Sequence, residues 1–236
     1  MIVLERTQKV LDILCHDDLF KNHDIRFVGG TALSYYLEHR LSEDLDFTML
    51  EFNYKVINDT MLKYSAVRIN NNLNEDVAIN DGFYASDCYV TYKLNDVKID
   101  FFEAPLNVME NEIWNEDNIE YYNNTNLKIL SLKSVLYMKT LAFWSRKKYR
   151  DLFDIYYVLK NNYITTEEFL NKYLKYNITY TLENLYEKIS SKNEFFEKDG
   201  DEGLSTLVDN PYAYEWYRNE IEKLIHKELL KELYTR

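Results

Sequence analysis

The chain has 236 residues, of which 46% are apolar, and a formal net charge of −12. This apolar content excludes a disordered chain, and no apolar run approaches the roughly 20 residues of a membrane span. The 40 acidic residues outnumber the 28 basic ones, which argues against a protein that coats nucleic acid electrostatically. Two isolated cysteines, Cys15 and Cys88, favour a cytoplasmic protein with free thiols.

The N-terminal part of the chain predicts helices that alternate with strands. Its first residues have the apolar spacing of an amphipathic helix and not the pattern of a signal peptide. An Asn/Asp-rich stretch, residues 70–87, predicts a loop or hairpin region, and the dipeptide Asn95-Asp96 predicts a tight hairpin turn. In chain order the predicted elements are a helix at 3–20, a strand at 24–30, a helix at 31–39, a strand at 45–50, a helix at 53–67 and two hairpin strands at 88–94 and 97–104.

From about residue 127 onward the periodicity is helical. Ser131 is a predicted N-cap, and Thr165 with Glu168 forms a capping-box pattern. The predicted helices are 131–146, 150–162, 165–175, 180–191 and 213–234, with a charged loop at 192–203. We therefore expect three parts: an α/β domain at 1–106, a linker at 107–124 and a helical domain at 125–236, with the domains packed together.

Two aspartates at the start of the second predicted strand are candidates for a metal site. Side chains alternate along a strand, so Asp44 and Asp46 point to one face, about 7 Å apart. Like charges in that arrangement repel unless a cation lies between them, and a hard divalent ion prefers oxygen ligands. The alternative is an ordinary polar strand face or turn exposed to solvent.

Two further features favour the metal site. Gly29 and Gly30 lie between a strand and a helix, where glycine allows a close backbone approach and where N–H groups at a helix start bind anions. A plain turn is the alternative. Asp100 lies on the polar face of the later strand "VKIDFFE", and it completes a three-acid set if that strand is adjacent to the first two aspartates.

This constellation resembles the nucleotidyltransferase superfamily of the DNA polymerase β type, which has a glycine pair, then D-x-D, then a later acid. The stretch "GGTALSYYLEHRLSEDLDF" is closer still to the AbiEii/AbiGii toxin branch, which reads GGTAL and then HR-x-S-x-D-[LI]-D. The later stretch "VLYMKTLAFWSRKKYRDLFDIYYVL" is similar to a second signature of that branch. The positions that fall on these two patterns are His39, Arg40, Ser42, Asp44, Asp46, Lys139, Arg146, Arg150, Asp151 and Asp154.

The resemblance implies an α+β fold, in which a nucleotidyltransferase-type mixed β-sheet with flanking helices is followed by a helical domain that closes the active-site cleft. It also implies a Mg²⁺-dependent transfer of a nucleotidyl group from an NTP such as ATP, with release of pyrophosphate and with two ions at the site. The implied metal ligands are Asp44, Asp46 and Asp100, and the implied catalytic residues are these three with Lys139 and Asp151. The implied nucleotide-binding residues are Gly29, Gly30, Thr31, Arg40, Ser42 and Lys139.

Several alternatives stay open at this point. From the residues alone, Lys139 and Asp151 also fit a snorkelling lysine and a surface ion-pair cluster. The resemblance implies RNA, particularly tRNA, as acceptor and a cognate antitoxin as partner, and a basic cluster at 145–150 is a candidate RNA contact, with a solvated helix end as its alternative. Competing hypotheses are transfer to a protein, a nucleotide-binding module without turnover, and a partner-binding protein whose interface is aromatic. The residues of that interface would be Tyr156, Tyr157, Tyr173, Tyr212 and Trp216.

Overall fold

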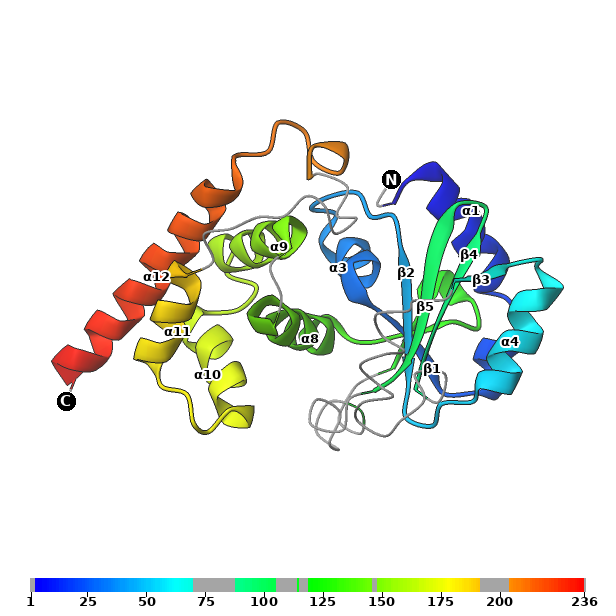
Figure 1. The fold of residues 1–236 in the computed structure, drawn as a ribbon, viewed down its shortest axis with the longest axis horizontal. Coiled ribbons are helices and arrows are strands. Elements are labelled where there is room, and N and C mark those ends of the chain that lie inside the picture. The colour runs from blue at the N-terminus through cyan, green and yellow to red at the C-terminus, as the bar shows by residue number, and fades with distance from the viewer. Residues whose placement is uncertain are drawn as a thin grey trace. The chain divides into compact units, whose positions relative to one another are not determined.

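The computed structural model describes residues 3–69, 88–104, 114, 119–145, 148–191 and 204–235. The chain divides into two compact units, Met1–Val135 and Leu136–Arg236. The first unit contains a β-sheet with flanking helices, and the second is helical (Figure 1). The predicted α+β fold class is therefore confirmed.

The first unit is built on a mixed sheet. Its strands are β1 (Ile25–Val28), β2 (Leu45–Met49), β3 (Val67–Ile69), β4 (Tyr89–Leu94), β5 (Val97–Glu103), β6 (Glu120–Tyr121) and β7 (Lys128–Ile129). Their order in the described sheet is β3-β4-β5-β2-β1-β7-β6. The parallel pairs are β1 with β7 and β2 with β5, and the other neighbours are antiparallel. The centre of the sheet therefore consists of β5, β2 and β1.

The sequence predicts the four longer strands and misses three short ones. The β4–β5 hairpin turns at Asn95 and Asp96, whose φ values of 50° and 62° are those of a two-residue turn that matches strand twist. By contrast, β3, β6 and β7 have only two or three residues each, too few to show a period of two. The predicted loop at 70–87 lies outside the described residues.

Four helices accompany the sheet in the described part of the first unit: α1 (Glu5–Leu14), α2 (Asp18–Asn22), α3 (Gly29–Leu37) and α4 (Tyr54–Lys63). The predicted single helix at 3–20 is in fact two helices, because the Asp17 side chain accepts a hydrogen bond from the Leu19 N–H and starts a new helix. Figure 1 shows α3 on one side of the sheet and α1 and α4 on the other.

An aromatic row forms the core beneath the central strands. Phe27, Phe47 and Phe101 are register partners on β1, β2 and β5, and all three are fully buried. Phe20 of α2 packs on Phe47, with ring centroids 5.1 Å apart, and Phe101 stacks on Phe47 at the same distance. Burial of these side chains fixes the register, because a shift of one residue would turn the row to the other face.

The helical part contains α8 (Leu132–Ser145), α9 (Tyr149–Lys160), α10 (Thr166–Tyr176), α11 (Leu182–Ser190) and α12 (Tyr214–Thr235). The capping box of Thr165 and Glu168 is formed as predicted. Phe143, Trp144 and Phe169 pack together, and α12 packs against α9 and α11. The two units divide within α8, later than the predicted start at residue 125, because β6 and β7 join the first sheet. Most of the predicted linker lies outside the described residues.

Among the described helices, none is long and apolar enough to cross a membrane. Cys15 and Cys88 are both free thiols.

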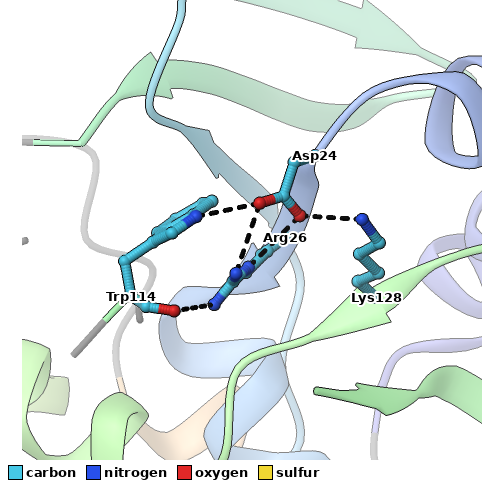
Figure 2. Close-up of polar contacts among 4 residues, drawn as sticks. All are labelled: Asp24, Arg26, Trp114 and Lys128. Atoms are coloured by element: carbon cyan, nitrogen blue, oxygen red, sulfur yellow. Dashed lines mark hydrogen bonds and ion pairs between the residues drawn. The ribbon is translucent and has the colours of Figure 1, made fainter. Parts of the chain in front are cut away.

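A polar cluster ties the start of β1 to β7 (Figure 2). The Asp24 carboxylate accepts hydrogen bonds from Lys128 Nζ at 2.8 Å and from Trp114 Nε1 at 2.8 Å, and it pairs with Arg26 Nη2 at 3.2 Å. Arg26 is buried and its guanidinium lies over the Trp114 ring, 3.8 Å from the centroid. Burial raises the pKa of Asp24, but the hydrogen bonds from Lys128 and Arg26 outweigh it, so the pKa lies below its ordinary value.

A carboxylate with a lowered pKa stabilises the fold above its unfolded-state pKa, about 3.9, and loses that contribution as the pH falls through its folded-state pKa. We therefore expect Asp24→Asn to lower the free energy of unfolding at pH 7, and the difference from wild type to shrink below about pH 4. Urea unfolding followed by circular dichroism measures this. Exposed Glu51→Gln is the control, and a deficit of Asp24→Asn that does not change with pH would contradict the assignment.

Candidate functional site

The parallel pairing of β2 with β5 brings two of the predicted acids together. Asp46 and Asp100 are register partners on neighbouring strands, which lie about 4.8 Å apart in a sheet. Because side chains alternate, both carboxylates point to the face opposite the aromatic row. Asp46 is half-buried and Asp100 is buried. The result is a pair of like charges held side by side, which we call the acidic pair.

The Asp100 carboxylate is held differently at its two oxygens. Oδ1 accepts hydrogen bonds from Thr91 Oγ1 at 2.7 Å and from Tyr89 Oη at 3.0 Å, both on β4. Oδ2 is paired with Lys98 Nζ at 2.5 Å. One oxygen is therefore fixed by hydroxyl groups of the sheet, and the other is neutralised by a lysine from its own strand.

The electrostatics of the acidic pair extend to its neighbours. Burial lowers the pKa of Lys98, but the charges of Asp100 and Asp46 outweigh it, so the pKa lies above its ordinary value. Burial and the Asp100 charge together raise the pKa of Tyr89 to about 12. Tyr89 is therefore a neutral hydrogen-bond donor to the carboxylate at any physiological pH.

Gly29 begins α3 and lies directly against the acidic pair. Its φ of 75° is in the left-handed region that favours glycine. A Cβ atom at this position would lie 2.0 Å from Asp46 Oδ2, so no other residue fits without moving the carboxylate. The structure thus brings the N-terminus of a helix, where backbone N–H groups favour an anion, next to the acidic pair.

The loop between α3 and β2 is pinned to the start of α3. Thr31 Oγ1 donates either to Ser42 Oγ, at 2.7 Å, or to the Asp44 carbonyl oxygen. Arg40 is buried, and its Nη2 would lie 2.7 Å from a Cβ added to Gly30. These contacts hold the loop against the start of α3. They are made by Thr31, Arg40 and Ser42, whose predicted contact with the nucleotide stays a prediction.

The same loop is held from the other side by the N-terminal residues. The Leu4 N–H donates to the Ser42 carbonyl oxygen at 3.0 Å, and Thr7 Oγ1 donates to the Glu43 carbonyl oxygen at 2.8 Å. The position of Asp44, immediately before β2, follows from these contacts on both sides.

The fit of a metal ion depends on which acids the structure brings together. The described residues contain no group of three or more His, Cys, Asp or Glu side chains placed to hold one. Asp44, Asp46 and Asp100 all lie among the described residues and do not form such a group, so a role of Asp44 as a metal ligand stays a prediction. The acidic pair does fit, because Mg²⁺ is bound in many phosphoryl-transfer sites by one or two carboxylates together with substrate phosphates and water.

The second unit contains a separate buried ionic cluster. Lys139 Nζ on α8 lies 2.6 Å from Asp151 Oδ1 and 2.5 Å from Asp154 Oδ2, both on α9. The three side chains are at most 7% exposed, which excludes the surface ion-pair alternative. Lys139 therefore forms ion pairs with two buried carboxylates. The predicted contact of Lys139 with a nucleotide phosphate and the catalytic role of Asp151 stay predictions.

The basic cluster proposed for RNA contact is described only in part. Arg146 and Lys147 lie outside the described residues, while Lys148 and Arg150 are half-buried. The cluster therefore stays a prediction.

The aromatic residues proposed as an interface separate into different groups. Tyr212 stacks on Trp216 with ring centroids 4.0 Å apart, and Tyr156 contacts Trp216 edge to face. Tyr157 instead packs on Tyr163, and Tyr173 packs on Trp144. Only Tyr212 among the five predicted residues is a large exposed apolar side chain.

A cavity of about 400 Å³ lies at the opposite end of the central strands from the acidic pair. It is lined by the start of β1 and the end of β2, whereas the acidic pair lies near the end of β1 and the start of β2. Its lining residues include Asp24, Ile25, Met49 and Ile57. None of the predicted site residues is among the residues that line it.

The sequence analysis assigns no role to four residues that contact predicted site residues. They are Tyr89, Thr91 and Lys98, which contact Asp100, and Asp154, which pairs with Lys139. A signal existed for two of them. A two-residue turn at Asn95-Asp96 fixes the hairpin register, which places Thr91 opposite Asp100, and strand alternation places Lys98 on the same face.

The chain is similar to known proteins over most of its length. A model of the family described as "Nucleotidyl transferase AbiEii toxin, Type IV TA system" matches residues 12–215. No curated protein matches. Among solved structures, JHP933 from Helicobacter pylori is 17% identical with a TM-score of 0.51, over 99% of this chain and 97% of that one. MenT4, the nucleotidyltransferase toxin Rv2826c of Mycobacterium tuberculosis H37Rv, is 11% identical with a TM-score of 0.49, over 94% and 84%. At these identities the likeness to JHP933 shows the fold alone.

The contact between Gly29 and Asp46 predicts the effect of adding one methyl group. We expect Gly29→Ala to lower the free energy of unfolding by roughly 1–3 kcal/mol, because it strains a left-handed backbone and displaces a carboxylate. Gly30→Ala is the matched control, since Gly30 lacks the left-handed φ and its Cβ would meet the side chains of Arg40 and Ser42 and not Asp46. Chemical denaturation measures both variants, and equal losses would show that the contact with Asp46 is not the cause.

The buried ionic cluster predicts that Lys139 also stabilises the fold. Lys139→Met should cost about 3–5 kcal/mol, because it removes a cation that lies within 2.6 Å of two buried carboxylates. Adding Asp154→Asn to this variant should recover part of the loss, whereas exposed Lys160→Met should have little effect. Denaturation of the three variants tests this, and a fully stable Lys139→Met protein would refute it.

Proposed function

Because the chain belongs to the nucleotidyl transferase AbiEii toxin family, we propose that its nucleotidyl transfer takes place at the acidic pair of Asp46 and Asp100. The observation that carries this proposal is their parallel register pairing, with Gly29 at the start of α3 packed against Asp46. The backbone N–H groups at the start of α3, at Gly29, Gly30 and Thr31, which we call the anion cradle, are thereby adjacent to two carboxylates. A metal-bound triphosphate needs this combination of groups.

The donor in this proposal is an NTP such as ATP, bound with Mg²⁺. The first backbone N–H groups of α3, at Gly29, Gly30 and Thr31, would bind the terminal phosphates. Asp46 and Asp100 would hold divalent metal, with Asp44 as a further ligand. When bound, the metal supplies charge neutralisation of the phosphates and lowers the pKa of the acceptor hydroxyl.

The residues around the cradle have positioning roles. Arg40 and Ser42 keep the loop against the start of α3, so that the carboxylate of Asp46 stays beside the backbone of Gly29. In the reaction, the acceptor hydroxyl loses its proton to water and its oxygen bonds to the α-phosphorus, the bond from the α-phosphorus to the oxygen that bridges to the β-phosphate breaks, and pyrophosphate leaves in line. Lys139 and Asp151 keep the roles that the resemblance implies, a phosphate contact and a catalytic acid.

The acceptor in this proposal is RNA, with tRNA as the first candidate, and the reaction is cytoplasmic, where NTPs and RNA are present. The family description names a type IV toxin–antitoxin system, so a cognate antitoxin is the expected protein partner. The acidic composition of the chain favours recognition of a limited part of the RNA over a broad electrostatic grip.

The test uses the full chain with each of the four α-labelled NTPs, Mg²⁺, total RNA and total protein. Label in RNA that requires one particular NTP supports the proposal, and isolation of the labelled species identifies the acceptor. Label in protein would shift the acceptor to a polypeptide. No label with any NTP in either fraction would favour the module without turnover.

Charge removal at the acidic pair gives the sharpest mutational prediction. Asp46→Ala should lower transfer at least about a hundredfold with little loss of folding, because it removes charge stabilisation that the transition state requires. Asp44→Ala should also abolish transfer if it completes the metal site. Exposed Asp59→Asn in the same unit is the control for net charge, and a fully active Asp46→Ala enzyme would overturn the assignment.

A further inference from the structure

Lys98 is the cation already present at the acidic pair. It precedes Asp100 by two residues on β5, so both side chains lie on one face of the strand. Its Nζ atom is 2.5 Å from Asp100 Oδ2, and its side chain is 44% exposed, against 11% for Asp100. A half-exposed ammonium on a flexible four-carbon stem can leave the carboxylate without unfolding the strand.

The oxygen that Lys98 occupies is the one that a metal ion would use. Oδ1 of Asp100 is already engaged by two hydroxyl groups, of Thr91 and Tyr89, which belong to the neighbouring strand. Oδ2 has Lys98 as its partner within the described structure. A metal ion held by Asp100 would therefore take Oδ2, where it would meet the ammonium.

A divalent ion and an ammonium group cannot share this oxygen closely, because two cations at contact distance repel strongly. We propose that Lys98 is a tethered counterion of the acidic pair, which neutralises it in the free protein and must leave Asp100 Oδ2 when a divalent ion binds. The inference rests on the proposed metal site at Asp46 and Asp100.

Two consequences follow for the free and the nucleotide-bound protein. Without nucleotide, Lys98 competes with the metal and keeps its affinity low. With nucleotide, triphosphate oxygens provide both extra ligands for the ion and a new partner for the displaced ammonium. The metal should therefore bind much more tightly together with an NTP than alone.

The test measures binding of Mn²⁺, a paramagnetic substitute for Mg²⁺, to the full chain by electron paramagnetic resonance in the absence of nucleotide. Lys98→Gln removes the charge and keeps a hydrogen-bond donor for Asp100. We expect it to bind Mn²⁺ at least about tenfold more tightly than wild type. The repulsion between the ammonium and a divalent ion at contact distance is worth that much even at the dielectric constant of water. Lys98→Arg keeps the charge and should keep the wild-type affinity.

Lys93→Gln is the matched control. Lys93 lies directly opposite Lys98 in the hairpin but pairs with Asp96, so its loss changes the net charge equally without freeing the acidic pair. It should leave the Mn²⁺ affinity near that of wild type. The rise in melting temperature on addition of Mn²⁺, measured for each variant, provides a second readout that also reports whether the variant is folded.

The outcomes separate this inference from the proposed function. If Asp46→Asn abolishes Mn²⁺ binding while Lys98→Gln binds no more tightly than wild type, the counterion role is wrong and the metal site stands. Equal tightening in Lys93→Gln or in Lys98→Arg would also overturn it. If neither wild type nor Lys98→Gln binds Mn²⁺, or Asp46→Asn binds it unchanged, the proposed metal site fails and the inference fails with it.

Discussion

The acidic pair is the constraint on which the rest of the first unit depends. Asp46 and Asp100 occupy the same register position on two parallel strands in the middle of the sheet, where their like charges repel. The strands stay paired because the opposite face buries the phenylalanine row of β1, β2 and β5. Hydrophobic burial on one face thus holds together carboxylates that would otherwise move apart.

The surroundings of the pair follow from this repulsion. Thr91 and Tyr89 donate hydrogen bonds to Asp100, and Lys98 neutralises it. On the other side, position 29 must be glycine because the Asp46 carboxylate fills the space of a side chain. The buried contacts of Thr31 and Ser42 then keep the start of α3 in place. Thr31 and Ser42, which are predicted to contact the nucleotide, therefore also hold the start of α3 in position.

The second unit contains charged side chains that are buried together. There, one lysine lies between two carboxylates that are almost fully buried. A buried ionic group of this kind adds little net stability compared with an apolar core, yet the loss of one partner is costly. The cluster of Lys139, Asp151 and Asp154 is therefore sensitive to substitution for structural reasons, apart from any part it has in nucleotidyl transfer.

Much of the fold and part of the site are determined locally and were predictable from the sequence. The hairpin at Asn95-Asp96, the glycines at the start of α3 and the capping box of α10 depend on neighbouring residues only. The family motifs likewise named Asp46 and Asp100 as candidate metal ligands, a role that stays a prediction. The tertiary structure decided what depends on long-range pairing: the strands β6 and β7, the contact of Gly29 with Asp46, and the burial of Arg40 and Ser42. These features could not be predicted because short strands carry no periodic signal and because a side chain's partner across a sheet is set by strand order, which a local pattern does not contain.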